Sequence, residues 1–208
     1  MALQQTLAAV TKKVIITIDE DDLQLLKKNN YKLCFAKKVG DADYNVVWQS
    51  YKKYLSYNEF SWTPQYQLFG TNTFNAGVKV VVSTNAVNIG LGQLSKLNEA
   101  GVLSSPVTGG PETGFTMVNE YGSIHPGVKQ LCTGIDGTQT SSPIYVSTAT
   151  AVQGKVTLTP VEKVLVWFEQ EVETSTMFSN ARSNSIELDL TTDNSLTRHY
   201  ADQKWVIE

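Results

Sequence analysis

Aromatic side chains are the main candidates for chemistry in this chain of 208 residues. Between residues 46 and 69, rings are interspersed with polar residues. Tryptophan and tyrosine faces can stack on a flat ligand, and their N–H and O–H groups can fix its orientation. We expect Trp48, Tyr51 and Trp62 to form the walls of a pocket, with Tyr121 and His125 adding polar contacts from the segment EYGSIHPG. Large β-cores also use such rings, so core packing is the alternative role.

Metal binding and nucleophilic catalysis find little support. The chain has two histidines, His125 and His199, and two cysteines, Cys34 and Cys132. A tetrahedral metal site would have to gather all four from remote positions without any paired spacing. No G-x-S-x-G motif is present, and His125 and Cys132 are a weak indication of a thiol–imidazole pair. We therefore expect a protein that is not an enzyme, with both cysteines buried as thiols.

A weak divalent-cation site is a further alternative. The string Asp41-Ala42-Asp43-Tyr44-Asn45 imitates the first five positions of a calcium loop. However, Val46 stands where that loop requires glycine, and Lys52 stands where it requires a bidentate glutamate. A turn between two strands explains the string more simply.

Charge and hydropathy exclude some partners. Seventeen basic and twenty acidic residues are interspersed along the chain, whereas nucleic-acid binders usually carry a basic stripe. We therefore expect no nucleic-acid partner. The first residues have no basic segment ahead of an apolar core, and no run reaches the ~18 apolar residues that suggest a membrane span. A cytoplasmic location without a transmembrane segment is the expectation.

The elements that must position these residues are mostly strands. β-branched residues predict a strand over 13–18, and a short helix follows near residues 19–29, with Asp19 as N-cap and Asp22 as capping-box acid. Further strands are expected at 31–37, 45–49 and 78–82, whereas Pro64 should interrupt any ladder through the aromatic run. Residues 83–142 are rich in Gly, Ser, Thr, Asn and Pro. We expect short strands within this segment, because so long a structureless loop is unusual in a compact domain.

The last third of the chain gives the clearest strands. They are predicted at 144–148, 155–159, 162–173, 185–191 and 197–207. Residues 185–190 alternate polar and apolar, as in a sheet with one wet face, whereas residues 164–168 are apolar on both faces. We therefore predict an all-β protein, a β-sandwich of about nine or ten strands with one short N-terminal helix, forming a single domain over residues 1–208.

Four stretches carry a resemblance to a known family: YKLCFAKK (31–38), VVWQSYKKYLSYNEFSWTPQYQLFG (46–70), EYGSIHPGVKQLCTGIDG (120–137) and VLVWFEQEVETSTMFSNARS (164–183). In them the chain resembles small cytosolic fungal proteins, the β-protein family that includes the pink chromoprotein of oyster mushrooms. The resemblance implies a non-enzymatic protein of the fruiting body that binds an organic, indolone-type chromophore. It marks no individual binding residues.

Two other classes of function stay open. The first is a β-sandwich defence protein, either a lectin or a membrane-binding cytolysin, whose rings and lysines would meet a glycan or a lipid surface. Rings on an exposed loop tip would favour that class, whereas rings that converge on a cavity favour a small aromatic molecule. Pore formation ranks below sugar binding, because the helix at 19–29 is short and a second helix over 3–10 would span nothing. The second class is a storage or scaffold protein without a ligand. A homo-oligomer is compatible with all three.

Overall fold

The computed structural model describes residues 10–207, which form fifteen strands and one helix. The elements in chain order are β1 (Lys12–Ile18), α1 (Glu20–Lys28), β2 (Lys32–Val39), β3 (Gln49–Tyr51), β4 (Tyr57–Thr71), β5 (Val87–Ile89), β6 (Gln93–Leu97), β7 (Val107–Thr108), β8 (Phe115–Asn119), β9 (His125–Thr133), β10 (Gln139–Val146), β11 (Gly154–Leu158), β12 (Pro160–Glu169), β13 (Ile186–Asp189), β14 (Ser195–Ala201) and β15 (Lys204–Val206). The predicted all-β, sandwich-like class is confirmed, with more and shorter strands than expected.

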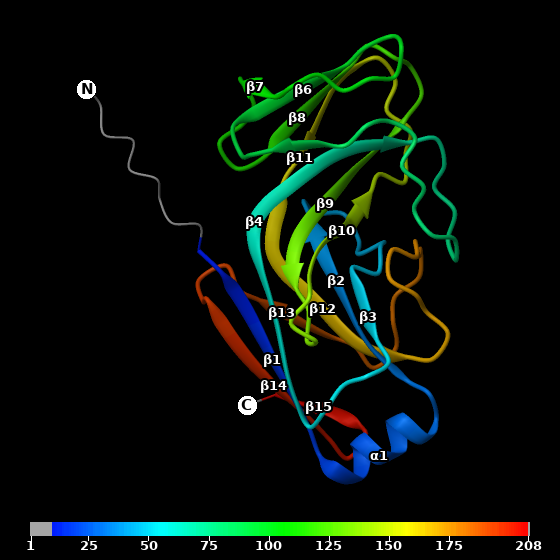
Figure 1. Ribbon diagram of the computed structural model, residues 1–208, viewed down its shortest axis with the longest axis vertical. Helices are drawn as coiled ribbons and strands as arrows, with labels where there is room; N and C mark the ends of the chain where they lie inside the picture. Colours follow the sequence, from blue (N-terminus) through cyan, green and yellow to red (C-terminus); the bar gives the residue numbers. More distant parts are fainter. Residues whose placement is uncertain (1–9, 208) are drawn as a thin grey trace, which may run out of the picture.

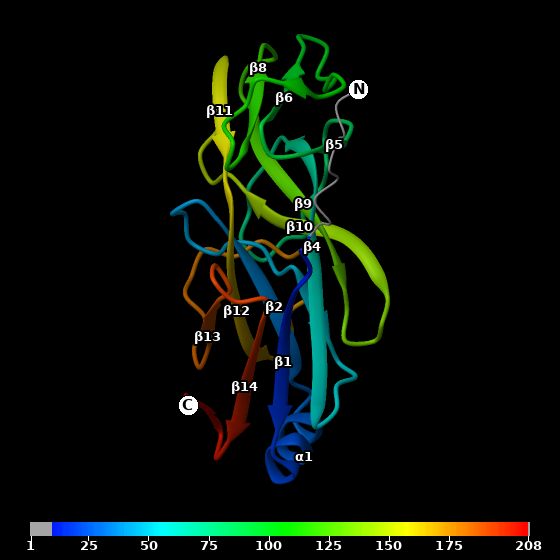
Figure 2. The ribbon, with the colours of Figure 1, turned by 90° about the vertical axis from the view of Figure 1, so that its left-hand side faces the viewer.

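The strands form one large sheet that faces two smaller ones (Figures 1 and 2). The large sheet has the order β10-β9-β4-β1-β14-β15, with β5 added on β4. The smaller sheets have the orders β13-β12-β2-β3 and β11-β8-β6-β7. Ring contacts join the layers: Phe60 of β4 stacks on Phe35 of β2 at 4.2 Å, and Tyr66 of β4 lies 5.6 Å from Phe115 of β8. Only Thr159 separates β11 from β12, so one segment of chain runs through both smaller sheets.

Hydrophobic periodicity explains the clearest strands. In β13, Ile186 and Leu188 are buried while Glu187 and Asp189 are exposed, which confirms the predicted alternation. The apolar segment 164–168 belongs to β12, which pairs with β13 on one side and β2 on the other. A strand with neighbours on both edges and covered faces needs apolar residues at successive positions.

Helix α1 is confirmed, but its predicted capping box is wrong. Asp19 occupies the N-cap without a side-chain capping bond, and its Oδ1 lies 3.1 Å from Nε2 of His199 instead. Asp22 is buried, and its carboxylate accepts the backbone N–H of Gln203 at 3.3 Å. Gln203 lies in the tight turn between β14 and β15, where its φ is +59°. Tertiary contacts therefore hold this end of the helix in place of local capping.

Three local expectations differ from the structure. β4 continues through Pro64, but its pairing with β9 shifts register between Trp62 and Tyr66, so the proline lies where no ladder bond is required. The predicted strand at 78–82 is wrong, because this segment forms a single bridge, from Lys79 to Thr176. The strand predicted at 45–49 is found only at its last residue: Val46 forms a single bridge to Met177, and Gln49 begins β3.

The polar middle of the chain does contain short strands, as predicted. Strands β5 to β9 and the first half of β10 lie within residues 83–142. The helix expected over 3–10 falls outside the described residues except for its last position. Within residues 10–207, no helix combines the length and the apolar character that crossing a membrane would require.

Candidate functional site

The tryptophans predicted to form pocket walls lie in the hydrophobic core. Trp48 is fully buried and Trp62 is 2% exposed. Their rings pack edge-to-face at 5.7 Å, and Phe60 contacts Trp48 at 5.0 Å. The Nε1 of Trp48 donates to the carbonyl oxygen of Gln130 at 3.4 Å. Their polar atoms are thus bonded within the protein, so these rings hold the two layers together.

Of the other three predicted residues, Tyr51 packs on the same cluster, with its ring 6.4 Å from that of Phe60, whereas His125 and Tyr121 do not. Tyr51 is half-buried at the end of β3, and His125 is buried, with its Nδ1 2.7 Å from the carbonyl oxygen of Ser147. Tyr121 is exposed in the loop before β9. In the β4–β9 ladder Trp62 pairs with Cys132, seven residues from His125, which separates the two ends by about 23 Å at the usual strand rise. The structure therefore groups Trp48, Tyr51 and Trp62 around Phe60 in the core and places His125 and Tyr121 away from them.

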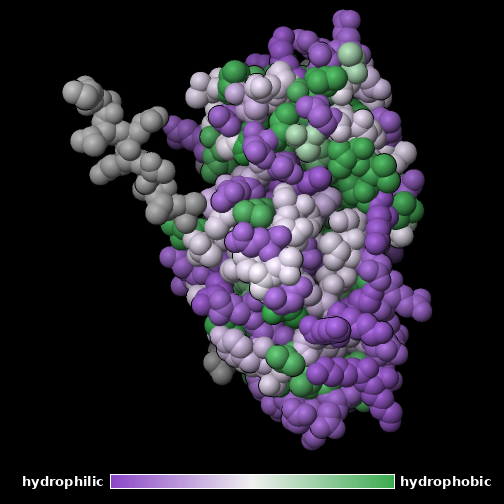
Figure 3. Space-filling model, in the orientation of Figure 1, coloured by the Kyte–Doolittle hydropathy of each residue, from purple (hydrophilic) through white to green (hydrophobic). Residues whose placement is uncertain are grey.

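A different group of residues forms a groove of about 780 Å³ at the end of the molecule that carries α1. We call it the tyrosine groove. Its residues come from the end of α1 and the following turn, from the loop between β3 and β4 with the start of β4, and from the turn between β9 and β10: Lys27, Asn30, Tyr31, Lys52, Lys53, Tyr54, Leu55, Tyr57, Asn58, Ile135 and Asp136. Figure 3 shows hydrophilic side chains prevailing at this end, with apolar spots among them.

Internal hydrogen bonds give the groove a fixed shape. Buried Asn58 clamps the loop, because its Nδ2 donates to the carbonyl oxygen of Leu55 at 2.6 Å and its Oδ1 accepts the N–H of Leu55 at 2.9 Å. The hydroxyl of Tyr54 donates to the carbonyl oxygen of Tyr31 at 2.9 Å, which ties the loop to the segment after α1. Burial raises the pKa of Tyr54, so its hydroxyl stays neutral at physiological pH.

The turn between β9 and β10 forms another wall of the groove. The Oδ1 of Asp136 accepts the N–H of Thr138 at 3.0 Å, which closes the turn. Gly134 is required here, because a Cβ at that position would overlap the hydroxyl of Tyr51. Tyr51 therefore supports the turn from outside the groove and is not a wall residue.

The groove could not be read directly from the sequence. Tyr31, Tyr54 and Tyr57 lie in turns or at the start of a strand, where no periodicity assigns them a face. The available signal was the repeated placement of lysine pairs, at 27–28 and 52–53, within a few residues of tyrosines. A link between those two segments appears only in the folded chain.

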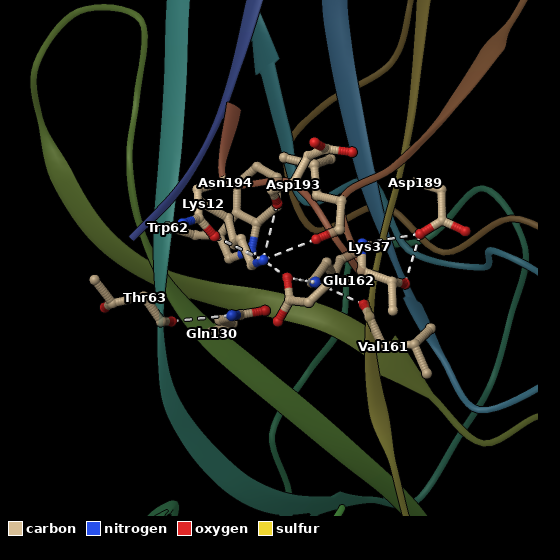
Figure 4. Close-up of polar contacts among 12 residues, drawn as sticks. Lys12, Lys37, Trp62, Thr63, Gln130, Val161, Glu162, Asp189, Asp193 and Asn194 are labelled. Atoms are coloured by element: carbon tan, nitrogen blue, oxygen red, sulfur yellow. Dashed lines mark hydrogen bonds and ion pairs between the residues drawn. The ribbon is translucent and has the colours of Figure 1, made fainter. Parts of the chain in front are cut away.

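A second polar cluster lies within the sandwich, around Glu162 (Figure 4). Its Oε2 accepts from Nζ of Lys37 at 2.7 Å and from Nε1 of Trp62 at 2.8 Å. The side chain of Lys37 is fully buried, and Nζ also donates to the carbonyl oxygen of Val161 at 2.6 Å. Burial lowers the pKa of Lys37 to about 8, although Glu162 acts in the opposite direction. Because the lysine is closed off from solvent, this cluster is structural: the ion pair joins neighbouring strands β2 and β12, and the bond from Trp62 of β4 connects it to the facing sheet.

The cysteines and the calcium-like string show no metal-binding arrangement. Burial raises the pKa of both thiols, that of Cys132 to about 12. Asn45 is buried, and its amide donates to the carbonyl oxygen of Val146 at 2.6 Å, so its side chain is directed into the protein. Among residues 10–207, no group of three or more His, Cys, Asp or Glu side chains is arranged to hold a metal ion.

Comparison with known proteins adds no relative to this picture. Neither the protein-family models, nor the curated proteins, nor the solved structures contain a significant match to the chain.

Proposed function

We propose that this protein binds a flat aromatic small molecule in the tyrosine groove and does not transform it. The observation that carries the proposal is the groove itself, whose 780 Å³ falls within the ~300–1,000 Å³ usual for small-molecule sites. Tyr31, Tyr57, Leu55 and Ile135 supply aromatic and aliphatic surface, whereas Tyr54 is 1% exposed and supports the groove from beneath. Burying a flat ligand there removes apolar area from water at roughly 25 cal/mol per Å², and stacking adds about 1 kcal/mol per ring.

The exposure of the rings supports a small molecule over a glycan or lipid surface. Within the aromatic run from residue 51 to residue 66, Tyr57 is the one ring on the exposed surface, at 54%. A lectin or membrane-binding tip would present several adjacent exposed rings. An indolone-type pigment, the ligand class that the sequence resemblance implies, is a flat conjugated molecule of suitable chemistry for this groove.

Two measurements test the proposal. An absorption spectrum of the protein from its natural source, followed by mass spectrometry of a solvent extract, should reveal a visible band and its carrier. For the recombinant chain, the neutral fluorescent probe phenylnaphthylamine should bind, and the double substitution Leu55→Ala with Tyr57→Ala should weaken binding about tenfold. The matched control is Val81→Ala with Val152→Ala, which truncates two exposed apolar side chains outside the groove.

Either of two results would contradict the proposal. One is a native protein with no bound chromophore whose recombinant form does not take up the probe. The other is equal affinity of the groove and control variants, which would place the probe elsewhere. A chain that binds no aromatic probe would leave storage or scaffolding as the better account.

A further inference from the structure

The tyrosine groove is bordered by lysines that have no carboxylate partner. Lys27 lies in the last turn of α1, and Lys52 and Lys53 lie in the loop that follows β3. Among the described residues, none of the three makes an ion pair within 4 Å. The single acid in the groove, Asp136, has one carboxylate oxygen engaged by the backbone of its own turn. The groove therefore combines apolar walls with a local excess of positive charge.

The three groove lysines differ from the paired lysines of the chain, although Lys12, Lys28, Lys79, Lys129, Lys155 and Lys204 likewise make no ion pair among the described residues. Six lysines elsewhere have carboxylate partners: Lys13 with Glu59, Lys32 with Glu173, Lys37 with Glu162, Lys38 with Glu187, Lys96 with Glu120, and Lys163 with Glu187 and Asp189. The chain as a whole carries a formal net charge of −3. The local charge of the groove is therefore opposite in sign to the net charge of the chain.

A second hollow, of about 500 Å³, serves as an internal comparison. It contains Lys79 and Arg182, but Glu169, Glu171 and Glu173 lie beside them. Arg182 forms an ion pair with Glu169 at 3.3 Å. The cations of that hollow are thus balanced by the protein's own carboxylates, whereas those of the tyrosine groove are not.

We infer that the ligand of the tyrosine groove carries an acidic group, recognised by Lys27, Lys52 and Lys53, on a flat aromatic body. This inference rests on the proposed function and names the chemical class of its ligand. A lysine ammonium is a flexible point charge, so the shared chemistry is an anion such as a carboxylate, sulfonate or phosphate. The aromatic body would lie against Tyr31 and Tyr57, while the acid would lie at the lysine border. Desolvation beside the apolar walls strengthens this attraction relative to open solvent.

A matched pair of probes separates the charge from the ring system. Anilinonaphthalene sulfonate and phenylnaphthylamine share their aromatic body and differ in the sulfonate. In fluorescence titrations of the full-length folded chain we expect the anionic probe to bind more tightly, with an affinity that falls as salt is raised. The double substitution Lys52→Gln with Lys53→Gln should weaken the anionic probe about tenfold and change the neutral probe less than about twofold.

The control variant removes two lysines outside the groove. Lys155 and Lys204 are exposed, lie in β11 and β15, and make no ion pair among the described residues. Lys155→Gln with Lys204→Gln changes the net charge equally and should leave both affinities unchanged. Circular dichroism of every variant confirms the native state, because the anionic probe also binds partly unfolded chains.

The outcomes distinguish the two proposals. Equal binding of both probes, with no effect of Lys52→Gln and Lys53→Gln, would overturn the acidic ligand and leave the aromatic site intact. Failure of both probes to bind would overturn the proposed function itself. Sedimentation with phosphatidylserine vesicles is the third arm. Vesicle binding that disappears with the same two lysines would assign them to lipid headgroups and overturn a free small acid as the ligand.

Discussion

Replacing Glu162 with glutamine should destabilise the protein strongly, because it leaves a buried ammonium without its charge partner. The Lys37 side chain is fully buried, whereas that of Glu162 is 26% exposed. After the substitution, the carbonyl oxygen of Val161 would remain as a neutral acceptor for Nζ. Removing one member of a buried pair costs about 3–5 kcal/mol in typical proteins. We therefore expect the free energy of unfolding at neutral pH to fall by about that amount.

The loss should shrink as pH rises. Burial lowers the pKa of Lys37 to about 8 in the folded wild type, against an ordinary value of 10.5. Glu162 opposes that shift, so Glu162→Gln lowers the pKa further. Between the folded and unfolded pKa values the unfolded chain binds more protons, so stability rises with pH in that range. In the variant this rise begins below pH 8, and in the wild type it begins near pH 8.

Urea denaturation followed by tryptophan fluorescence, repeated between about pH 6 and pH 8, measures both effects. Glu187→Gln is the matched control, since its carboxylate forms surface pairs with Lys38 and Lys163 and should cost less than about 1 kcal/mol. Adding Lys37→Met to Glu162→Gln should recover part of the loss, because the unpaired ammonium is removed. A loss below about 1 kcal/mol at every pH would refute the reasoning.

Two further predictions concern buried positions. A Cβ at Gly127 would overlap the ring of Phe69, so Gly127→Ala should lower the free energy of unfolding by about 1–3 kcal/mol in denaturant titrations, and unchanged stability would contradict the packing. Burial and the raised pKa of Cys34 and Cys132 predict that neither thiol reacts with Ellman's reagent in the folded chain at pH 8, and that both react after unfolding. Labelling of either thiol in the native state would show that it is accessible.

Much of the fold was predictable, because the burial of a strand's faces determines the pattern of apolar and polar residues along it. The alternation of β13 and the apolar run in β12 both gave the correct element and the correct orientation. Helix α1 was recognisable from its leucines and its terminal lysines. The segment 78–82 was misassigned, since β-branched residues favour a strand only where a partner strand is available.

The candidate site was harder, because its residues meet only through tertiary structure. Phe60 and Trp62 lie two positions apart in β4 and share its buried face, a spacing that already indicated core packing. The polar edges of the same rings favour a pocket, so ring chemistry and strand spacing predict different roles. Tyr31 and Tyr57, in contrast, are brought to one groove by the turns around α1 and β4. Nothing local in their sequence specifies that meeting.

The segment formed by β11 and β12 has a mechanical consequence. These strands are continuous through Thr159. Separating the sheet β11-β8-β6-β7 from the sheet β13-β12-β2-β3 would therefore require pulling a single extended chain out of both. The two ends of the molecule should therefore open in one cooperative step rather than fray independently. A ligand bound beside α1 would then slow hydrogen exchange in β8, at the opposite end, without contacting it.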